Sequence, residues 1–213
     1  MHNDIRHENR DHHVNQGTLL TQEKQKKLGF GRFLSKVVHP PTVPYIHVTM
    51  TLYLLRHGDA LESGYNDTSR PLSLIGEEQA ATVANFFAAM RYPVGAILSS
   101  PLVRARQMAD IIEEKLGNAE TQQTEFLVPD TNEKQLFEQL NGLNIASVLL
   151  IGHEPHLRTT ASLLVSGSRD MFLELKKSTL VCIDCPRGVA PEAGLLKWMV
   201  RVEQMELMKP ENP

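Results

Sequence analysis

The sequence predicts a three-layer αβα fold of the α/β class, in which helices cover both faces of a mostly parallel central sheet. Two observations predict this fold. From Met50 onwards, short apolar segments alternate with longer segments whose apolar residues have helical spacing, and strands that alternate with helices form mostly parallel sheets. The segment 147–151 is also apolar after its first residue, as is typical of a strand that is buried on both faces.

The first strand and the first helix come directly after Met50. Residues 51–56 form a short apolar run that ends in polar residues, which predicts a buried strand. A helix is expected over 74–91, because Ser73 is a suitable N-cap for it. The residues that predict its buried face recur at helical spacing: Ala80, Val83, Ala84 and Phe87.

The second strand is expected at 96–98 and the second helix at 101–116. Proline has no N–H group to leave unpaired at a helix start, so Pro101 suits the first helical position. Gly117 then ends the helix, since glycine readily adopts the left-handed backbone that follows a helix.

The remaining elements continue the alternation. The apolar run 125–128 predicts a third strand, and helices are expected over 132–141 and 155–166 on either side of the apolar strand 147–151. The strands 178–184 and 195–200 are joined by a connection rich in proline and glycine. We expect these two to pair as an antiparallel hairpin at the end of the fold.

The chain is expected to divide near Met50. Residues 1–49 are polar and rich in histidine at first, and we expect an N-terminal extension that is disordered or weakly helical. Residues 50–203 form the predicted domain, and residues 204–213 a C-terminal tail. Met50 stands just before the first strand and is therefore a candidate translation start.

The segment 22–38 has two interpretations. Its lysines and arginines lie among apolar residues, so it can form a basic amphipathic helix that associates with a membrane surface or a partner. Alternatively, it is a solvated linker, and Gly29 and Gly31 favour this interpretation because glycine weakens helices.

Composition limits the class of protein. The net charge of −3 over 213 residues argues against a general nucleic-acid binder, which needs many unopposed cations. Cys182 and Cys185 are too few for a disulfide framework or a four-cysteine zinc site, and three residues apart on a strand they point to opposite faces. No apolar run approaches the length of a membrane span, so we expect a soluble, cytoplasmic protein.

Three strand ends carry matching chemistry. Arg56 and His57 end the first strand, Arg104 lies in the first turn of the helix after the second, and His153 follows the strand 147–151. The carboxyl ends of parallel strands meet at one edge of a sheet, where open α/β sheets bind ligands. Two arginines and two histidines are thus expected to form a pocket for a phosphoryl dianion, with a nucleophile in it.

Four motifs follow the predicted strands in order. They are Leu55-Arg56-His57-Gly58-Asp59-Ala60, Asp67-Thr68-Ser69-Arg70-Pro71-Leu72-Ser73, Ser99-Ser100-Pro101-Leu102-Val103-Arg104-Ala105-Arg106-Gln107 and Ile151-Gly152-His153-Glu154-Pro155-His156. With these motifs the chain resembles the histidine phosphatase superfamily, and within it the SixA-like branch of phosphohistidine phosphatases. The resemblance spans roughly residues 50–203 and implies a phosphoglycerate-mutase-like fold with short inserts.

The resemblance also implies roles for individual residues. His57 would attack phosphorus and form a covalent phosphohistidine, while Arg56 and Arg104 hold the phosphoryl oxygens. His153 would complete the pocket as a protonated donor. Arg70 would contact the substrate or support the pocket, or alternatively it is an exposed structural arginine. No metal or other cofactor is expected, because the arginines supply the positive charge.

The proton donor is the open part of this pattern. Longer relatives carry a glutamate for this role in an insert between the second and third strand ends, and the corresponding stretch here, residues 125–130, is short. The candidates are Asp67, Asp59 and Glu154, and we favour Asp67 because it lies in the loop at the pocket rim. A phosphoramidate needs such an acid least, since its leaving nitrogen can enter protonated.

The predicted function is that of a metal-independent phosphatase that acts on phosphorylated protein, phosphohistidine in particular. The alternatives are a phosphatase of small phosphorylated metabolites and, ranked below it, a phosphate-binding regulator without activity. A mutase is disfavoured, because it must keep its phosphorylated intermediate away from water.

Overall fold

The structure, a computed structural model, describes residues 49–117 and 119–208 of the chain. The predictions for residues 1–48, including the basic segment 22–38, lie outside the described residues. The described part contains a six-stranded sheet, helices on both of its faces and two short 3-10 helices. In chain order the elements are β1 (Met50–Arg56), η1 (Asp67–Ser69), α1 (Leu74–Met90), β2 (Ala96–Ser99), α2 (Val103–Leu116), β3 (Thr121–Gln123), η2 (Glu125–Leu127), α3 (Glu133–Asn141), β4 (Ser147–Gly152), α4 (His156–Ser166), β5 (Leu180–Cys185), β6 (Leu195–Val200) and α5 (Val202–Leu207).

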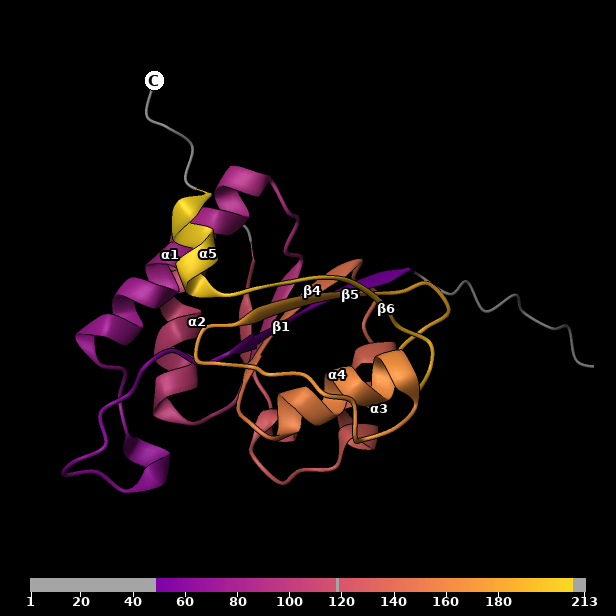
Figure 1. Ribbon diagram of the computed structural model, residues 1–213, viewed down its shortest axis with the longest axis horizontal. Coiled ribbons are helices and arrows are strands. Elements are labelled where there is room, and N and C mark those ends of the chain that lie inside the picture. The colour runs from indigo at the N-terminus through magenta and orange to yellow at the C-terminus, as the bar shows by residue number, and fades with distance from the viewer. Residues whose placement is uncertain (1–48, 118, 209–213) are drawn as a thin grey trace, which may run out of the picture. The chain divides into compact units, whose positions relative to one another are not determined.

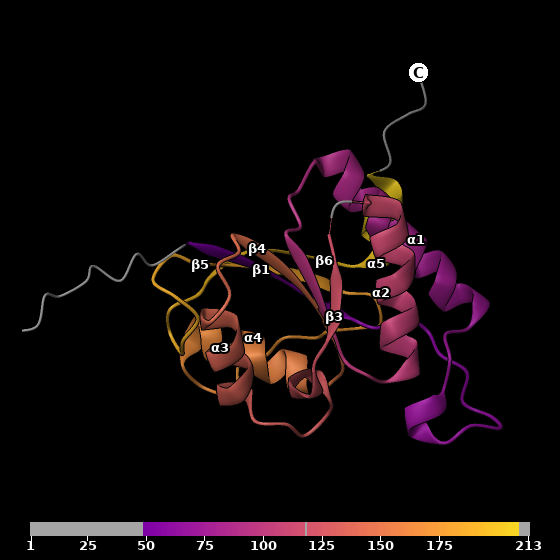
Figure 2. The same cartoon turned by 180° about the vertical axis from the view of Figure 1, so that it is seen from behind.

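The sheet confirms the predicted αβα architecture. Its strand order is β3-β2-β4-β1-β5-β6, and the first four strands of this order are parallel. β5 pairs antiparallel with β1 and with β6, which is the expected terminal hairpin. Helices α1, α2 and α5 cover one face of the sheet and helices α3 and α4 the other, as the two opposite views show (Figures 1 and 2).

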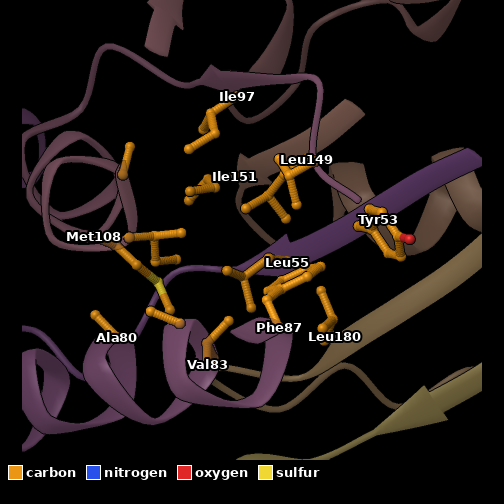
Figure 3. Packing of buried hydrophobic residues seen from close by; sticks show 14 of the residues in the cluster. Tyr53, Leu55, Ala80, Val83, Phe87, Ile97, Met108, Leu149, Ile151 and Leu180 are labelled. Carbon is orange, nitrogen blue, oxygen red and sulfur yellow. The ribbon is translucent and has the colours of Figure 1, made fainter. Parts of the chain in front are cut away.

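Alternating side chains of each central strand build two cores. On β1, Tyr53 and Leu55 point to the face covered by α1 and α2, where they pack with Phe87 and Met108 (Figure 3). Leu52 and Leu54 point to the other face, against α3 and α4. A strand side chain alternates between faces with every residue, so a strand apolar throughout can bury both sides. The same alternation places Cys182 and Cys185 in opposite cores, as expected.

The connections leave a crevice at one edge of the sheet. β1 and β4 are parallel neighbours, but the helix that follows β1 packs on one face and the helix that follows β4 packs on the other. Adjacent parallel strands whose chains depart to opposite faces form a topological switch point, where α/β sheets bind ligands. His57 and His153 are the first residues beyond these two strands.

Three local predictions require correction. The apolar run 125–128 is not a strand: residues 125–127 form η2, and the third strand is the preceding polar segment Thr121–Gln123. An edge strand half open to water does not need apolar alternation, so its sequence lacks the usual signal. Pro101 is not the first helical residue, because α2 begins at Val103 after an extended Leu102. Helix α5 runs past residue 203, where we expected the domain to end, and buries Met205 in the core.

Membrane insertion of a helix has no support in the described part of the chain, since none of its helices has the length and apolar character that a span requires.

We expect Leu54→Ala to lower the free energy of unfolding by about 2–5 kcal/mol, because it leaves a cavity in a packed core. Leu54 is fully buried, and denaturant unfolding measures the loss. The matched control is Leu74→Ala, the same change at a side chain that is 79% exposed, and its effect should stay within about 0.5 kcal/mol. Equal losses in the two variants would contradict the packing described here.

Candidate active site

A polar cavity of about 280 Å³ lies at the carboxyl edge of the sheet. It brings together all six residues for which the sequence predicted a catalytic or substrate-binding role. The residues that line it are Arg56, His57, Ala60, Glu62, Asp67, Arg70, Arg104, Pro129, His153, Glu154 and Lys177. Four cations and three carboxyl groups therefore surround two imidazoles, an arrangement suited to an anion.

The hydrogen bonds of His57 define its tautomer. The ring atom Nδ1 lies 2.7 Å from the carbonyl oxygen of Gly58, and the guanidinium Nε of Arg104 lies 3.1 Å from Nε2. A carbonyl oxygen only accepts and a guanidinium only donates. Both contacts are satisfied when Nδ1 carries the proton, so the lone pair of the ring is on Nε2, where it accepts from Arg104.

Burial keeps the His57 ring neutral. Desolvation lowers its pKa from 6.5 to about 3, and the nearby guanidinium groups of Arg104 and Arg56 act in the same direction. The bond to Gly58 opposes this shift without reversing it. An unprotonated imidazole is the form that can attack an electrophile, so His57 is in its nucleophilic state at neutral pH.

Arg104 is held by the loop that precedes α1. Its Nη1 donates to the main-chain oxygen of Asp67 over 2.6 Å, and its Nη2 lies 3.3 Å from the Asp67 carboxylate. The other carboxylate oxygen of Asp67 accepts from Arg70 over 2.7 Å. These bonds, that to Arg70 above all, lower the pKa of Asp67. Asp67 therefore stays a carboxylate that orients two arginines, and it does not suit the role of proton donor that we favoured for it.

Two further cations, Arg56 and Lys177, line the same cavity. Arg56 donates from Nη1 to the main-chain oxygen of Leu175 over 2.7 Å, while its buried Nε has no hydrogen-bond partner. Lys177 lies 2.6 Å from a carboxylate oxygen of Asp59, and this contact is the main reason that the pKa of Asp59 is lowered. Asp59 is thus a second carboxylate without a proton to give.

His153 faces His57 from the neighbouring strand. The two ring centroids are 4.9 Å apart, and Nε2 of His153 lies 2.8 Å from the hydroxyl of Ser100. Burial lowers the pKa of His153 to about 2, helped by the neighbouring His57 and Arg104. The ring is therefore neutral here, whereas we expected it to be protonated. A phosphoryl dianion in the cavity would raise this pKa, because it stabilises the imidazolium form.

Glycine permits the close approach between the His57 loop and α1. Neither Gly58 nor Gly76 has a positive φ, so neither is needed for a turn. A Cβ atom on Gly76 would overlap the carbonyl oxygen of Asp59, and one on Gly58 would lie 3.0 Å from the carbonyl oxygen of Gly76. The first turn of α1 thus packs directly on the main chain that carries the nucleophile.

Sequence reasoning assigned no role to Lys177 and Ser100. β5 runs antiparallel to β1, so the residues before β5 lie at the same edge as the residues after β1, and this brings Lys177 to the cavity. Its signal in the sequence was the pair Lys176-Lys177 directly before the predicted strand 178–184. Ser100 belongs to the motif at residues 99–107, and its hydrogen bond with His153 could not be predicted from that motif.

Within residues 49–117 and 119–208, no three His, Cys, Asp or Glu side chains lie together in a group that could hold a metal ion. The positive charges that face the cavity are those of its own arginines and lysine.

Comparison with known proteins agrees with this geometry. The family model of the histidine phosphatase superfamily (branch 1) matches residues 52–128. An uncharacterized protein of Picosynechococcus sp. is 31% identical over 137 residues, 62% of this chain and 83% of that protein. The phosphohistidine phosphatase SixA of Escherichia coli is 29% identical over 110 residues, 50% of this chain and 68% of that protein. A solved structure of the protein histidine phosphatase SixA complexed with tungstate has a TM-score of 0.62 and 25% identity, and the match covers 73% of this chain and 99% of that one.

The chain belongs to the histidine phosphatase superfamily, and within it the chain is SixA-like. This class of protein is a phosphatase that works through a histidine, which agrees with the neutral imidazole found among cations at the switch point.

We predict that the protein loses stability as the pH falls from about 7 to about 4. Histidines of the unfolded chain bind protons near pH 6.5, whereas folded His57 and His153 bind them only near pH 3 and pH 2. Each of the two rings therefore lowers the free energy of unfolding by about 1.4 kcal/mol for every pH unit below the unfolded-state pKa. Urea unfolding at several pH values measures the slope. It should become shallower in His153→Asn, and an unchanged slope would contradict the neutral burial of His153.

Proposed function

We propose that the chain hydrolyses a phosphoryl group through a covalent phosphohistidine on His57, and that its substrate is a phosphorylated protein that carries phosphohistidine. The observation that carries this proposal is the tautomer of His57. Its Nδ1 proton is held by the Gly58 carbonyl, and the lone pair is on Nε2, which accepts from Arg104 at a cavity also lined by Arg56 and Lys177.

In the first step, Nε2 of His57 attacks phosphorus as the bond from phosphorus to the leaving group breaks. The lone pair is engaged by Nε of Arg104, so the guanidinium must first turn from the ring to a phosphoryl oxygen. A dianion supplies the reason for this exchange, because a charge-assisted bond to a phosphoryl oxygen is stronger than one to a neutral ring. Asp67 holds the other end of Arg104 meanwhile.

In the second step, water attacks the phosphorus of the intermediate, and inorganic phosphate leaves as the bond to Nε2 breaks. Arg56, Arg104 and Lys177 stabilise the charge on the phosphoryl oxygens in both transition states. His153 gains a proton as the dianion enters and then donates to it, since the dianion offsets the burial that keeps the ring neutral.

Two observations support phosphohistidine as the substrate. Of the described residues between Arg104 and His153, the one that lines the cavity is Pro129, so this stretch supplies no acid. A phosphoramidate needs an enzyme acid least, because its nitrogen can leave already protonated. The relative from Escherichia coli is a phosphohistidine phosphatase, and the SixA structure holds tungstate, an oxyanion with the charge and shape of phosphate.

We expect His57→Ala to lower kcat by roughly 10³-fold or more, because it removes the nucleophile. The same variant should no longer retain acid-labile radioactive phosphate on the protein after quenching. Phosphate binding should survive in part, since the arginines remain. The matched control is His156→Asn, which changes another buried histidine whose ring lines a separate cavity. His156→Asn should still retain radioactive phosphate on the protein. Turnover by His57→Ala at the wild-type rate would exclude the covalent mechanism.

A substrate panel tests the second half of the proposal. We expect kcat/KM for a phosphohistidine protein to exceed that for sugar phosphates by about tenfold or more, because a nitrogen that leaves already protonated needs less help than an alkoxide oxygen. Release of inorganic phosphate measures both reactions. A preference for sugar phosphates would instead identify a phosphatase of small metabolites.

A further inference from the structure

Three carboxyl groups line the cavity, and their surroundings differ. Glu62 is exposed. Asp67 is exposed too, and its two oxygens lie against Arg70 and Arg104. The side chain of Glu154 is 22% exposed, and it alone of the three combines burial with an unpaired oxygen.

The unpaired oxygen of Glu154 is Oε1, which is buried without a hydrogen-bond partner. Oε2 lies 3.4 Å from Nε of Arg158, one helical turn along α4. A buried and unpaired carboxyl oxygen favours the protonated form, because a neutral carboxyl group loses less hydration on burial than a carboxylate does. Burial accordingly raises the pKa of Glu154, although Arg56 and Arg158 oppose the shift.

Two other carboxyl groups near His57, those of Asp59 and Asp67, are held as anions. Lys177 and the hydroxyl of Ser73 contact Asp59, and both bonds lower its pKa. Asp67 is in the same condition beside its two arginines. An acid catalyst must carry its proton at the working pH, so these two carboxylates are unsuited to that role.

We propose that Glu154 is the group that protonates the leaving atom in the first step and accepts a proton from the attacking water in the second. The proposal rests on the phosphatase function proposed above. As the bond from phosphorus to the leaving oxygen breaks, that oxygen takes the proton of the Glu154 carboxyl group. The resulting carboxylate then removes a proton from water while the water oxygen bonds to phosphorus and the bond to Nε2 of His57 breaks. Inorganic phosphate leaves, and Glu154 is again protonated.

The placement of Glu154 suits this role. It follows His153 directly, on the chain that leaves β4 for α4, whereas the nucleophile follows the neighbouring strand β1. Acid and nucleophile thus line one cavity from two different strand ends. The charged and titratable groups that face the same cavity or pair with Glu154 are Arg56, His57, Glu62, Asp67, Arg70, Arg104, His153, Arg158 and Lys177.

The test compares leaving groups. Phenyl phosphate releases a poor leaving group and p-nitrophenyl phosphate a good one, which needs little help from an acid. We expect Glu154→Gln to lower kcat/KM for phenyl phosphate by about 100-fold and that for p-nitrophenyl phosphate by less than about tenfold. Phosphohistidine should follow p-nitrophenyl phosphate, because its nitrogen leaves protonated. Glu62→Gln makes the same substitution at an exposed carboxyl group of the cavity and should keep the wild-type ratio of the two substrates. Equal losses on both substrates in Glu154→Gln, or no loss, would overturn the assignment.

A measurement on the wild-type protein avoids any folding defect of the variant. The acid must be protonated, so kcat/KM for phenyl phosphate should fall as the pH rises through the raised pKa of Glu154. The profile for p-nitrophenyl phosphate should stay flatter over the same range, after each profile is corrected for the ionisation of its own phosphate group, which is more acidic in the nitro compound. Identical profiles would overturn the role of Glu154 and leave the phosphatase function intact. Turnover of neither substrate, nor of phosphohistidine, would overturn both.

Discussion

The site depends on the parallel pairing of β1 with β4. The last pair of that ladder sets Arg56 beside Gly152, and one residue further the amide of His57 donates to the carbonyl oxygen of Gly152 over 3.0 Å. This bond fixes where the chain of β1 turns away from the sheet, and hence where the ring of His57 lies. His153 is the residue that follows Gly152 at the end of β4, so the same pairing also fixes its position. A shift of one residue in this pairing would turn every side chain of β1 to the opposite face, so the two cores and the two histidines share a single register.

Burial and charge act together on the two imidazoles. Each ring is removed from water and surrounded by cations, and both conditions favour the neutral form. The folded protein is less stable at low pH for this reason, yet the same condition keeps His57 unprotonated. Stability is thus lower than it would be with apolar residues in these places, as is common where ionisable groups serve a function. The carboxylates of Asp59 and Asp67 offset part of the cost, since they neutralise Lys177 and Arg104 at the cavity wall.

The central strands and the residues at their ends could be predicted from the sequence, because a buried parallel strand is apolar and a polar residue marks its end. Arg56, His57, Arg104 and His153 were found on this signal. The polar edge strand β3 was missed, since it is half solvated and its three residues resemble a loop. The position of Lys177 at the cavity depends on the antiparallel pairing of β5 with β1, which no local sequence pattern encodes. The surroundings of Glu154 depend on burial and on Arg158 and Arg56 in the folded chain, so the sequence indicated it as a candidate and could not rank it above Asp67.

The contact between Arg104 and His57 has a consequence for chemical selectivity. As long as the guanidinium donates to Nε2, the lone pair is occupied and the ring is a poor nucleophile towards any electrophile that enters the cavity. A neutral electrophile offers the guanidinium nothing in exchange, whereas an anion draws it away and frees the ring at the same moment. Reactivity is in this way conditional on the charge of the incoming molecule, and discrimination begins before any bond to phosphorus forms.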